Sequence, residues 1–514
     1  MSGEGSSLGG RIASRSAAAL VAAVLVALAG VAPAVAAATG PGAHAPGVAA
    51  GPHAAGSGAG AGVPGAPAAQ SDGLNPCVGT VEQRPETTTL VSIQGARGGG
   101  KTAALLVGVA PNGSVHGVHN DTADGRWWSY DVDPLPNGEL LMATTEPGIS
   151  VVERIDPATG ETTEVTRLEN VEDAHDVDYL GDGEFVTVDK GDERNRVVIF
   201  DESGEIVWQW RFGEHTDRFP RDGGGPYGED WTHVNDVDPI GNGTLMVSVR
   251  NFDQVVAIDR DTKEVKWTLG EDDNYDVLNE QHNPDFIRGE NGTPTVLVAD
   301  SENDRVVEYA RTADGDWERT WTLSGGGLQE PRDADRLPNG NTLVTDRRGH
   351  RVLEVTPRGE VVWEFYTPWQ PYDAERVGTD PGSEGPTMRQ VGGEGDQTMT
   401  GGAGYDAERI ESCYEYLLDV ERDRLVPDDE LWGDGGDLDD AGTATATSGG
   451  GDDTGGGDAD GDGTGTREWT TVPDDASVVD TPGLGVPVAL AALTLALATA
   501  LATRRRRRDG DRRG

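Results

Sequence analysis

Three of the nine histidines stand at related places in the chain. His175 and His282 each come directly before an Asp-containing motif that recurs along the sequence, and His233 lies two residues earlier relative to its own copy. Arg250 follows in a Ser-Val-Arg-Asn segment. Imidazole can serve as base, acid or nucleophile, and the forked guanidinium matches the oxygens of sulfate or phosphate. These residue types predict oxyanion chemistry, with a metal site as the alternative.

Residues 95–102 (Gly-Ala-Arg-Gly-Gly-Gly-Lys-Thr) fit the phosphate-binding P-loop pattern. A P-loop must open a helix whose N-terminus holds the phosphate. Here residues 104–109 are typical of a strand and residues 111–113 (Pro-Asn-Gly) of a turn. We therefore interpret the motif as a glycine-rich hairpin and expect no nucleotide cofactor. Residues 458–463 imitate a calcium loop, but Trp469 stands where its glutamate is needed, so we expect no metal there.

The elements that must position the histidines come from the recurring motif itself. Each copy has an Asp, an Asn-Gly or Asp-Gly turn, two alternating strands and a strand that carries tryptophan. The copies follow one another at steps of 45, 60, 47 and 50 residues, as marked by Asp133, Asp178, Asp238, Asp285 and Asp335. A looser copy at residues 90–119 makes six units. Such a period predicts an all-β fold, a six-bladed β-propeller.

The propeller gives a reason why the histidines should meet. The first strand of each blade lines the central channel, so equivalent positions converge on one axis. His175 and His282 should therefore face each other there, and His233 should share their direction because residues two apart on a strand point the same way. Arg250 ends the next strand and should reach the same mouth. Tryptophans such as Trp210 are expected in the core between blades.

Composition divides the chain into five segments. Residues 1–38 have the basic start, apolar run and small residues of a signal peptide, and residues 39–76 are a Gly/Ala/Pro-rich linker. Residues 77–425 hold the propeller with a C-terminal closing segment, and residues 426–481 are an acidic Gly/Asp-rich linker. Residues 482–514 combine an apolar span with an arginine cluster, which indicates a transmembrane or processed sorting segment. We expect a protein on the outer face of the cell, held at the membrane by this segment or by a lipid.

The charge is strongly negative. The formal net charge is −49, with 90 acidic against 41 basic residues. Such a surface repels nucleic acid and is typical of proteins from salt-loving organisms, in which carboxylates keep the surface hydrated. Cys77 and Cys413 bracket the predicted propeller, and in an oxidising compartment they either form a disulfide or remain two free thiols.

The segments around the histidines resemble one known family, the arylsulfate sulfotransferases, including the shorter forms of salt-loving archaea. The resemblance covers roughly residues 87–377. The matching segments are His175-Asp176-Val177, residues 230–235 (Asp-Trp-Thr-His-Val-Asn), residues 248–251 (Ser-Val-Arg-Asn), residues 280–284 (Glu-Gln-His-Asn-Pro) and residues 337–343 (Leu-Pro-Asn-Gly-Asn-Thr-Leu).

This resemblance implies a six-bladed propeller that moves a sulfuryl group from a phenolic sulfate donor to a phenol acceptor without a cofactor. His282 would be the nucleophile that becomes transiently sulfated. His175 and His233 would bind the sulfuryl oxygens and manage the phenol proton, and Arg250 would stabilise the charge on the transferring group. The residues also admit a non-catalytic surface propeller that binds glycan or protein, or a metal-dependent hydrolase or lactonase.

Overall fold

The computed structural model describes residues 75–97, 100–191, 194–289, 292–379, 382–420 and 424–433. The predicted signal peptide at 1–38, the span at 482–514, the calcium-like residues 458–463 and most of both linkers lie outside these ranges. Within the described ranges, none of the helices combines the length and the apolar character that crossing a bilayer requires.

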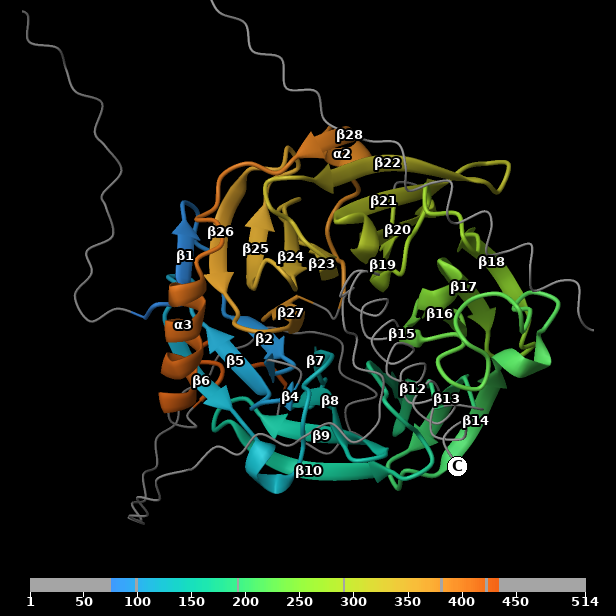
Figure 1. The fold of residues 1–514 in the computed structure, drawn as a ribbon, viewed down its shortest axis with the longest axis horizontal. Coiled ribbons are helices and arrows are strands. Elements are labelled where there is room, and N and C mark those ends of the chain that lie inside the picture. The colour runs from blue at the N-terminus through green and yellow to red at the C-terminus, as the bar shows by residue number, and fades with distance from the viewer. Residues whose placement is uncertain are drawn as a thin grey trace, which may run out of the picture. The chain divides into compact units, whose positions relative to one another are not determined.

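Six small antiparallel sheets form a ring, the predicted six-bladed β-propeller (Figure 1). The innermost strands are β7 (Val132–Pro134), β11 (Val177–Gly181), β15 (Val234–Pro239), β19 (His282–Arg288), β23 (Pro331–Arg336) and β27 (Pro371–Arg376). The second strands are β8 (Leu140–Glu146), β12 (Glu184–Asp189), β16 (Thr244–Val249), β20 (Pro294–Asp300), β24 (Thr342–Asp346) and β2 (Thr89–Ile93).

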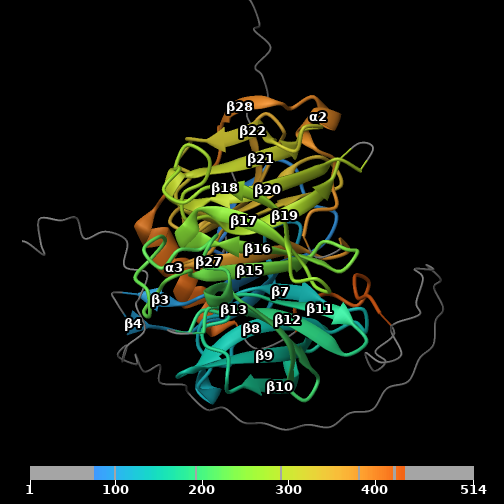
Figure 2. The same cartoon turned by 90° about the vertical axis from the view of Figure 1, so that its right-hand side faces the viewer.

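The outer half of each blade completes the four-stranded unit. The third strands are β9 (Ile149–Asp156), β13 (Arg196–Asp201), β17 (Gln254–Asp259), β21 (Arg305–Arg311), β25 (Arg351–Val355) and β5 (Leu105–Val109). The outermost strands are β10 (Glu161–Leu168), β14 (Ile206–Arg211), β18 (Val265–Gly270), β22 (Trp317–Ser324), β26 (Val361–Tyr366) and β6 (Val115–His119). From the side, the blade β19–β22 lies next to the blade β15–β18 (Figure 2).

The ring closes by pairing strands that lie far apart in the sequence. β27 pairs with β2, so the blade expected at residues 90–119 takes its innermost strand from the C-terminal side. β1 (Val78–Val81) is added to the outer edge of β26, and β28 (Gly395–Thr398) runs parallel to β22. Two helices follow the last blade strand, α2 (Met388–Val391) and α3 (Ala407–Asp419). A disulfide between Cys77 and Cys413 joins the residue before β1 to α3.

Two of the motifs singled out in the sequence have a clear place in this fold. In the P-loop-like segment, β3 (Ala96–Arg97) and β4 (Gly100–Lys101) pair as a short hairpin, and no helix follows among the described residues 100–109. Among the predicted core tryptophans, Trp210, Trp321 and Trp363 are fully buried, whereas Trp208 and Trp267 are only partly buried.

The first aspartate of the recurring motif links one blade to the next. Asp131 accepts a hydrogen bond from the backbone N–H of Val177 (3.4 Å), and Asp176 accepts one from Val237 (2.6 Å). The link also crosses the closure, where Asp373 of β27 accepts from the N–H of Val132 (3.0 Å). Each of these bonds satisfies a backbone donor that the neighbouring innermost strand exposes toward the axis.

The second aspartate adds to a group of buried carboxylates on the innermost strands. Burial first, and then the charges of neighbouring carboxylates, raise the pKa of Asp178 and Asp238 well above the ordinary value. Burial raises the pKa of Asp176 and Asp373 to about 7 and that of Asp285 to about 6. The axis of the propeller is therefore lined by acids that favour the protonated form.

Candidate functional site

The starts of the innermost strands meet around one pocket. Five of its lining residues lie within two residues of these starts and come from five different blades. They are Tyr130, His175, His282, Arg332 and Tyr372. The remaining lining residues are Gln94, Trp128, Asp173, Lys190, His233, Arg347 and Gln370. The pocket is thus assembled from residues that the repeat places in equivalent positions.

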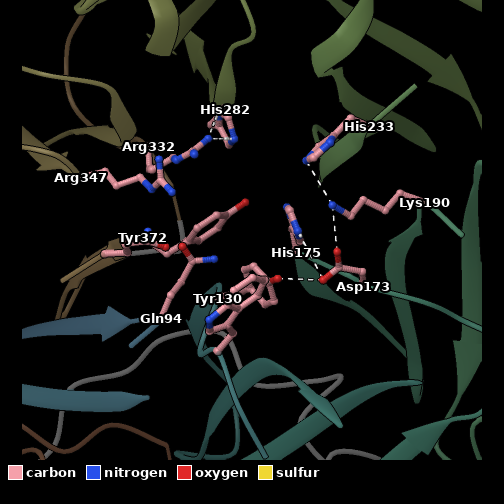
Figure 3. A pocket seen from close by; sticks show the side chains of 12 residues that line it. Gln94, Tyr130, Asp173, His175, Lys190, His233, His282, Arg332, Arg347 and Tyr372 are labelled. Carbon is pink, nitrogen blue, oxygen red and sulfur yellow. Dashed lines mark hydrogen bonds and ion pairs between the residues drawn. The ribbon is translucent and has the colours of Figure 1, made fainter. Parts of the chain in front are cut away.

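The structure brings the three predicted histidines into this pocket, with all three nearly buried (Figure 3). The rings of His175 and His233 have centroids 5.5 Å apart, and His282 lies 6.4 Å from the ring of Tyr372. His233 reaches the pocket although it precedes its strand, because its backbone has a positive φ of 43° and the pairing of β15 with β16 is irregular between Val234 and Asp236. Such a backbone conformation is uncommon for a residue other than glycine.

His233 is held neutral by its surroundings. Its Nδ1 lies 2.8 Å from the carboxylate of Asp230, and its Nε2 lies 3.2 Å from Nζ of Lys190. Burial, together with the charges of Lys190 and Arg250, lowers the pKa of His233 to about 3, against the opposing effect of Asp230. Nδ1–H therefore donates to Asp230, and the Nε2 lone pair accepts from the ammonium of Lys190.

Asp173 connects two sides of the pocket. It accepts a hydrogen bond from the Tyr130 hydroxyl (2.8 Å) and pairs with Lys190 (2.8 Å) and His175 (3.6 Å). Burial alone would raise the pKa of Asp173, but the charge of Lys190 and the contacts with His175 hold it well below the ordinary value. The ring of His175 stacks on Tyr130 with centroids 4.3 Å apart. Tyr130 therefore contacts the face of the imidazole ring, and Asp173 contacts its edge.

The orientation of His282 follows from Ser301, the residue that comes directly after β20. The Ser301 hydroxyl donates to the carbonyl of Pro331 (2.7 Å), so its oxygen can accept from Nδ1–H of His282 (2.9 Å). With the proton on Nδ1, the lone pair of His282 is on Nε2. Nη1 of Arg332 contacts that nitrogen and also lies 2.9 Å from Nδ1. The nitrogen of His282 that carries the lone pair is therefore covered by a cation.

Arg250 does not line the pocket and lies behind His233. Its Nη1 is 3.3 Å from Nδ1 of His233 and 3.1 Å from Oδ1 of Asn251, and its Nη2 pairs with Glu280. The structure thus places Arg250 next to the predicted site, where it acts on His233 through its charge.

Two groups of described residues bring three possible metal ligands close together, and neither includes a pocket histidine. One is His119, Asp121 and Glu153, and the other is Asp253, Asp272 and Asp273. In the first group, Arg126 pairs with both carboxylates (2.6 Å to Asp121), so a cation already occupies the position next to them.

Two models of one family match this chain. Both are described as arylsulfotransferase, and they match residues 109–284 and 204–367. Together they span residues 109–367, which include His175, His233, His282 and Arg332. The chain belongs to the arylsulfotransferase family. No curated protein matches it significantly.

Several solved structures resemble this arylsulfotransferase family member at a distance. A protein of unknown function from Bacteroides caccae is 14% identical over 55% of this chain and 94% of its own (TM-score 0.40). The periplasmic gluconolactonase of Pseudomonas aeruginosa is 14% identical over 56% of this chain and 98% of its own (TM-score 0.39). Virginiamycin B lyase from Staphylococcus aureus is 10% identical over 50% of this chain and 73% of its own (TM-score 0.31). Such distant similarity says nothing about activity.

Sequence reasoning missed several residues of the arylsulfotransferase pocket, and two signals could have found them. The residue before the Asp motif is a pocket residue in several blades, which predicts Tyr130, Arg332 and Tyr372 as well as the histidines. The residue that follows each second strand is another such position. It is Gln94, Lys190 or Arg347 in three blades, and in two others it is Arg250 or Ser301, which contact pocket histidines without lining the pocket.

Proposed function

We propose that this family member transfers a sulfuryl group from an aryl sulfate to a phenol through a covalent intermediate on His282. The family matches support sulfuryl transfer. The observation that supports the mechanism is the fixed tautomer of His282, whose Nδ1 is held by Ser301 (2.9 Å) while Nε2 carries the lone pair. A covalent step divides the exchange into two easier reactions.

In the first half-reaction, Nε2 of His282 attacks sulfur, and the bond between sulfur and the aryl oxygen breaks. The leaving phenolate takes a proton from the pair formed by His233 and Lys190. In the second half-reaction, the oxygen of the acceptor phenol attacks sulfur, its proton returns to that pair, and the bond between nitrogen and sulfur breaks. His175 and Lys190 face the negative sulfuryl oxygens, and Arg250 acts through His233.

The test is acceptor-dependent release of donor phenol. The purified protein in concentrated salt, given 4-nitrophenyl sulfate and phenol, should release 4-nitrophenol and form phenyl sulfate. His282→Ala should lower turnover by at least about a thousandfold, since it removes the nucleophile. His215→Ala is the matched control, because His215 stacks on Trp210 outside the pocket. Full turnover by His282→Ala would contradict the covalent mechanism.

We further propose that the protein acts outside the cell and is anchored through residues 482–514. The support is the composition of the two ends of the chain, an apolar run after a basic start and a second apolar run before an arginine cluster. A chain that lacks residues 482–514 should appear in the medium instead of the membrane fraction. Continued membrane association of that shortened chain would contradict the anchor.

A further inference from the structure

One side of the pocket carries more positive charge than a single sulfuryl group requires. Arg332 and Arg347 both line the pocket and are almost completely buried. Both contact the same carboxylate, Glu330, which also contacts Arg348. Glu330 therefore contacts three guanidiniums, two of which line the pocket.

The whole pocket shows the same excess. Its lining contains three basic side chains, Lys190, Arg332 and Arg347, against one carboxylate, Asp173. Asp173 is already paired with Lys190 at 2.8 Å. The whole chain has 90 acidic and 41 basic residues, so a pocket lined by more basic than acidic side chains differs from the chain's average composition. Burying guanidinium groups costs free energy unless anions accompany them, so this arrangement suits an anionic ligand.

The cations lie in two places. Figure 3 shows Lys190 with His233 on one side of the pocket and Arg332 with Arg347 on the other, with His282 and Tyr372 between them. The sulfuryl group, on the proposed function, lies between His282, His175 and His233. The pair Arg332 and Arg347 can then hold a different negative group of the same substrate.

We propose that Arg332 and Arg347 form a second anion subsite, and that the aryl substrates of this protein carry a carboxylate in addition to the oxygen that is sulfated. This inference rests on the proposed function. The forked guanidinium matches a carboxylate with two parallel hydrogen bonds. The aromatic side chains of Trp128, Tyr130 and Tyr372 line the same pocket and can enclose the aryl ring that joins the two anionic groups.

The subsite is coupled to the nucleophile through Arg332. Its Nη2 is 2.9 Å from Glu330, while its Nη1 contacts His282 at Nε2, the nitrogen with the lone pair. A carboxylate that draws Arg332 toward Arg347 uncovers that nitrogen. An anionic aryl substrate is therefore expected to gain in kcat as well as in binding.

The experiment compares two acceptors of the same shape, with 4-nitrophenyl sulfate as the donor at one salt concentration. 4-Hydroxybenzoate carries the carboxylate, and 4-hydroxybenzamide has a neutral head. The wild-type protein should favour the benzoate in kcat/KM by about tenfold or more, the effect of one charge-assisted hydrogen-bonded pair. Equal values for the two acceptors would overturn the subsite, and this comparison needs no variant.

Arg347→Gln should reduce the preference to less than about threefold, and Arg347→Lys should keep part of it. Arg348→Gln is the matched control, because Arg348 contacts the same Glu330 but is 40% exposed and lies outside the pocket lining, so the preference should persist. An unchanged ratio in Arg347→Gln would overturn the proposal even if both rates fall. Absence of acceptor-dependent 4-nitrophenol release with any phenol would instead contradict the proposed function itself.

Discussion

His233 and His282 are the same residue type in one pocket, and their neighbours give them different chemistry. His233 lies between the carboxylate of Asp230 and the ammonium of Lys190, and its pKa is lowered to about 3. His282 has its Nδ1 on Ser301 and its Nε2 under Arg332. In the proposed mechanism, His233 therefore exchanges a proton with Lys190 and His282 attacks sulfur.

Lys190→Gln tests the role of the charge beside His233. Removing that cation should raise the pKa of His233 from about 3 toward its ordinary value of 6.5. Below its pKa the imidazole is charged and cannot accept the phenol proton. The variant also lacks the ammonium that shares the proton in the proposed mechanism, so kcat should fall, and the acidic limb of the kcat/KM profile for the acceptor should move upward from near pH 3. Lys263→Gln on the outside of the ring is the control, and an acidic limb that stays in place would refute this role.

Ser301→Ala tests whether the tautomer of His282 matters. The variant loses one of two acceptors near Nδ1–H and keeps the Glu280 carbonyl at 3.1 Å, so the fraction of His282 with its lone pair on Nε2 falls. We expect kcat to drop about tenfold, the value of one hydrogen bond, with KM changed less than about twofold. A rise in KM at constant kcat would show that Ser301 shapes substrate binding instead.

At the scale of the element, the innermost strand is the functional unit. A residue at or near its start contributes to the pocket, the first aspartate of the motif accepts a hydrogen bond from the next blade, and the second adds to the buried acids of the axis. The sequence shows this three-part unit clearly at residues 175–178, which lead into β11 and contain His175, Asp176 and Asp178. The irregular pairing at His233 could not be read in the same way, because it depends on the neighbouring strand.

Asp178→Asn tests the group of buried acids. A carboxyl whose pKa is raised in the folded state stabilises the fold at low pH, and that stability is lost as the pH rises through the raised pKa. Replacing one such carboxyl with a neutral amide should raise the melting temperature at pH 8 by roughly 2–5 °C and change it little at pH 4. Asp396→Asn, exposed on β28, is the control. A lower melting temperature at pH 8 would contradict mutual repulsion.

At the scale of the whole molecule, the ring is closed by segments from both sides of the described chain. β27 completes the blade that contains β2, and β1 is added to the blade that contains β26. The disulfide between Cys77 and Cys413 spans 336 residues and lies in the core where α3 packs on the sheets. Because no blade can bury its faces alone, this closure supports the pocket as well as the fold.

The double variant Cys77→Ser, Cys413→Ser tests how much the disulfide contributes to the stability of the closed ring. A cross-link over so long a loop restricts the unfolded chain, so its loss should lower the free energy of unfolding by on the order of 3–5 kcal/mol. A reductant should lower the melting temperature of the wild-type protein to that of the double variant and leave the variant unchanged. Equal stability of the two oxidised proteins would show that strand pairing alone closes the ring.

The sequence alone determined the repeat, the six blades and the equivalence of His175 and His282, because local alternation and turn residues repeat at a fixed period. The sequence also places Arg332 directly before an Asp motif and Arg347 directly after a second strand. Only the folded structure brings these two residues into one pocket. The tertiary structure decided which blade β27 completes, that Arg250 lies behind His233, and that one carboxylate, Glu330, serves three arginines. These depend on contacts between blades that are distant in the chain, which no local pattern encodes.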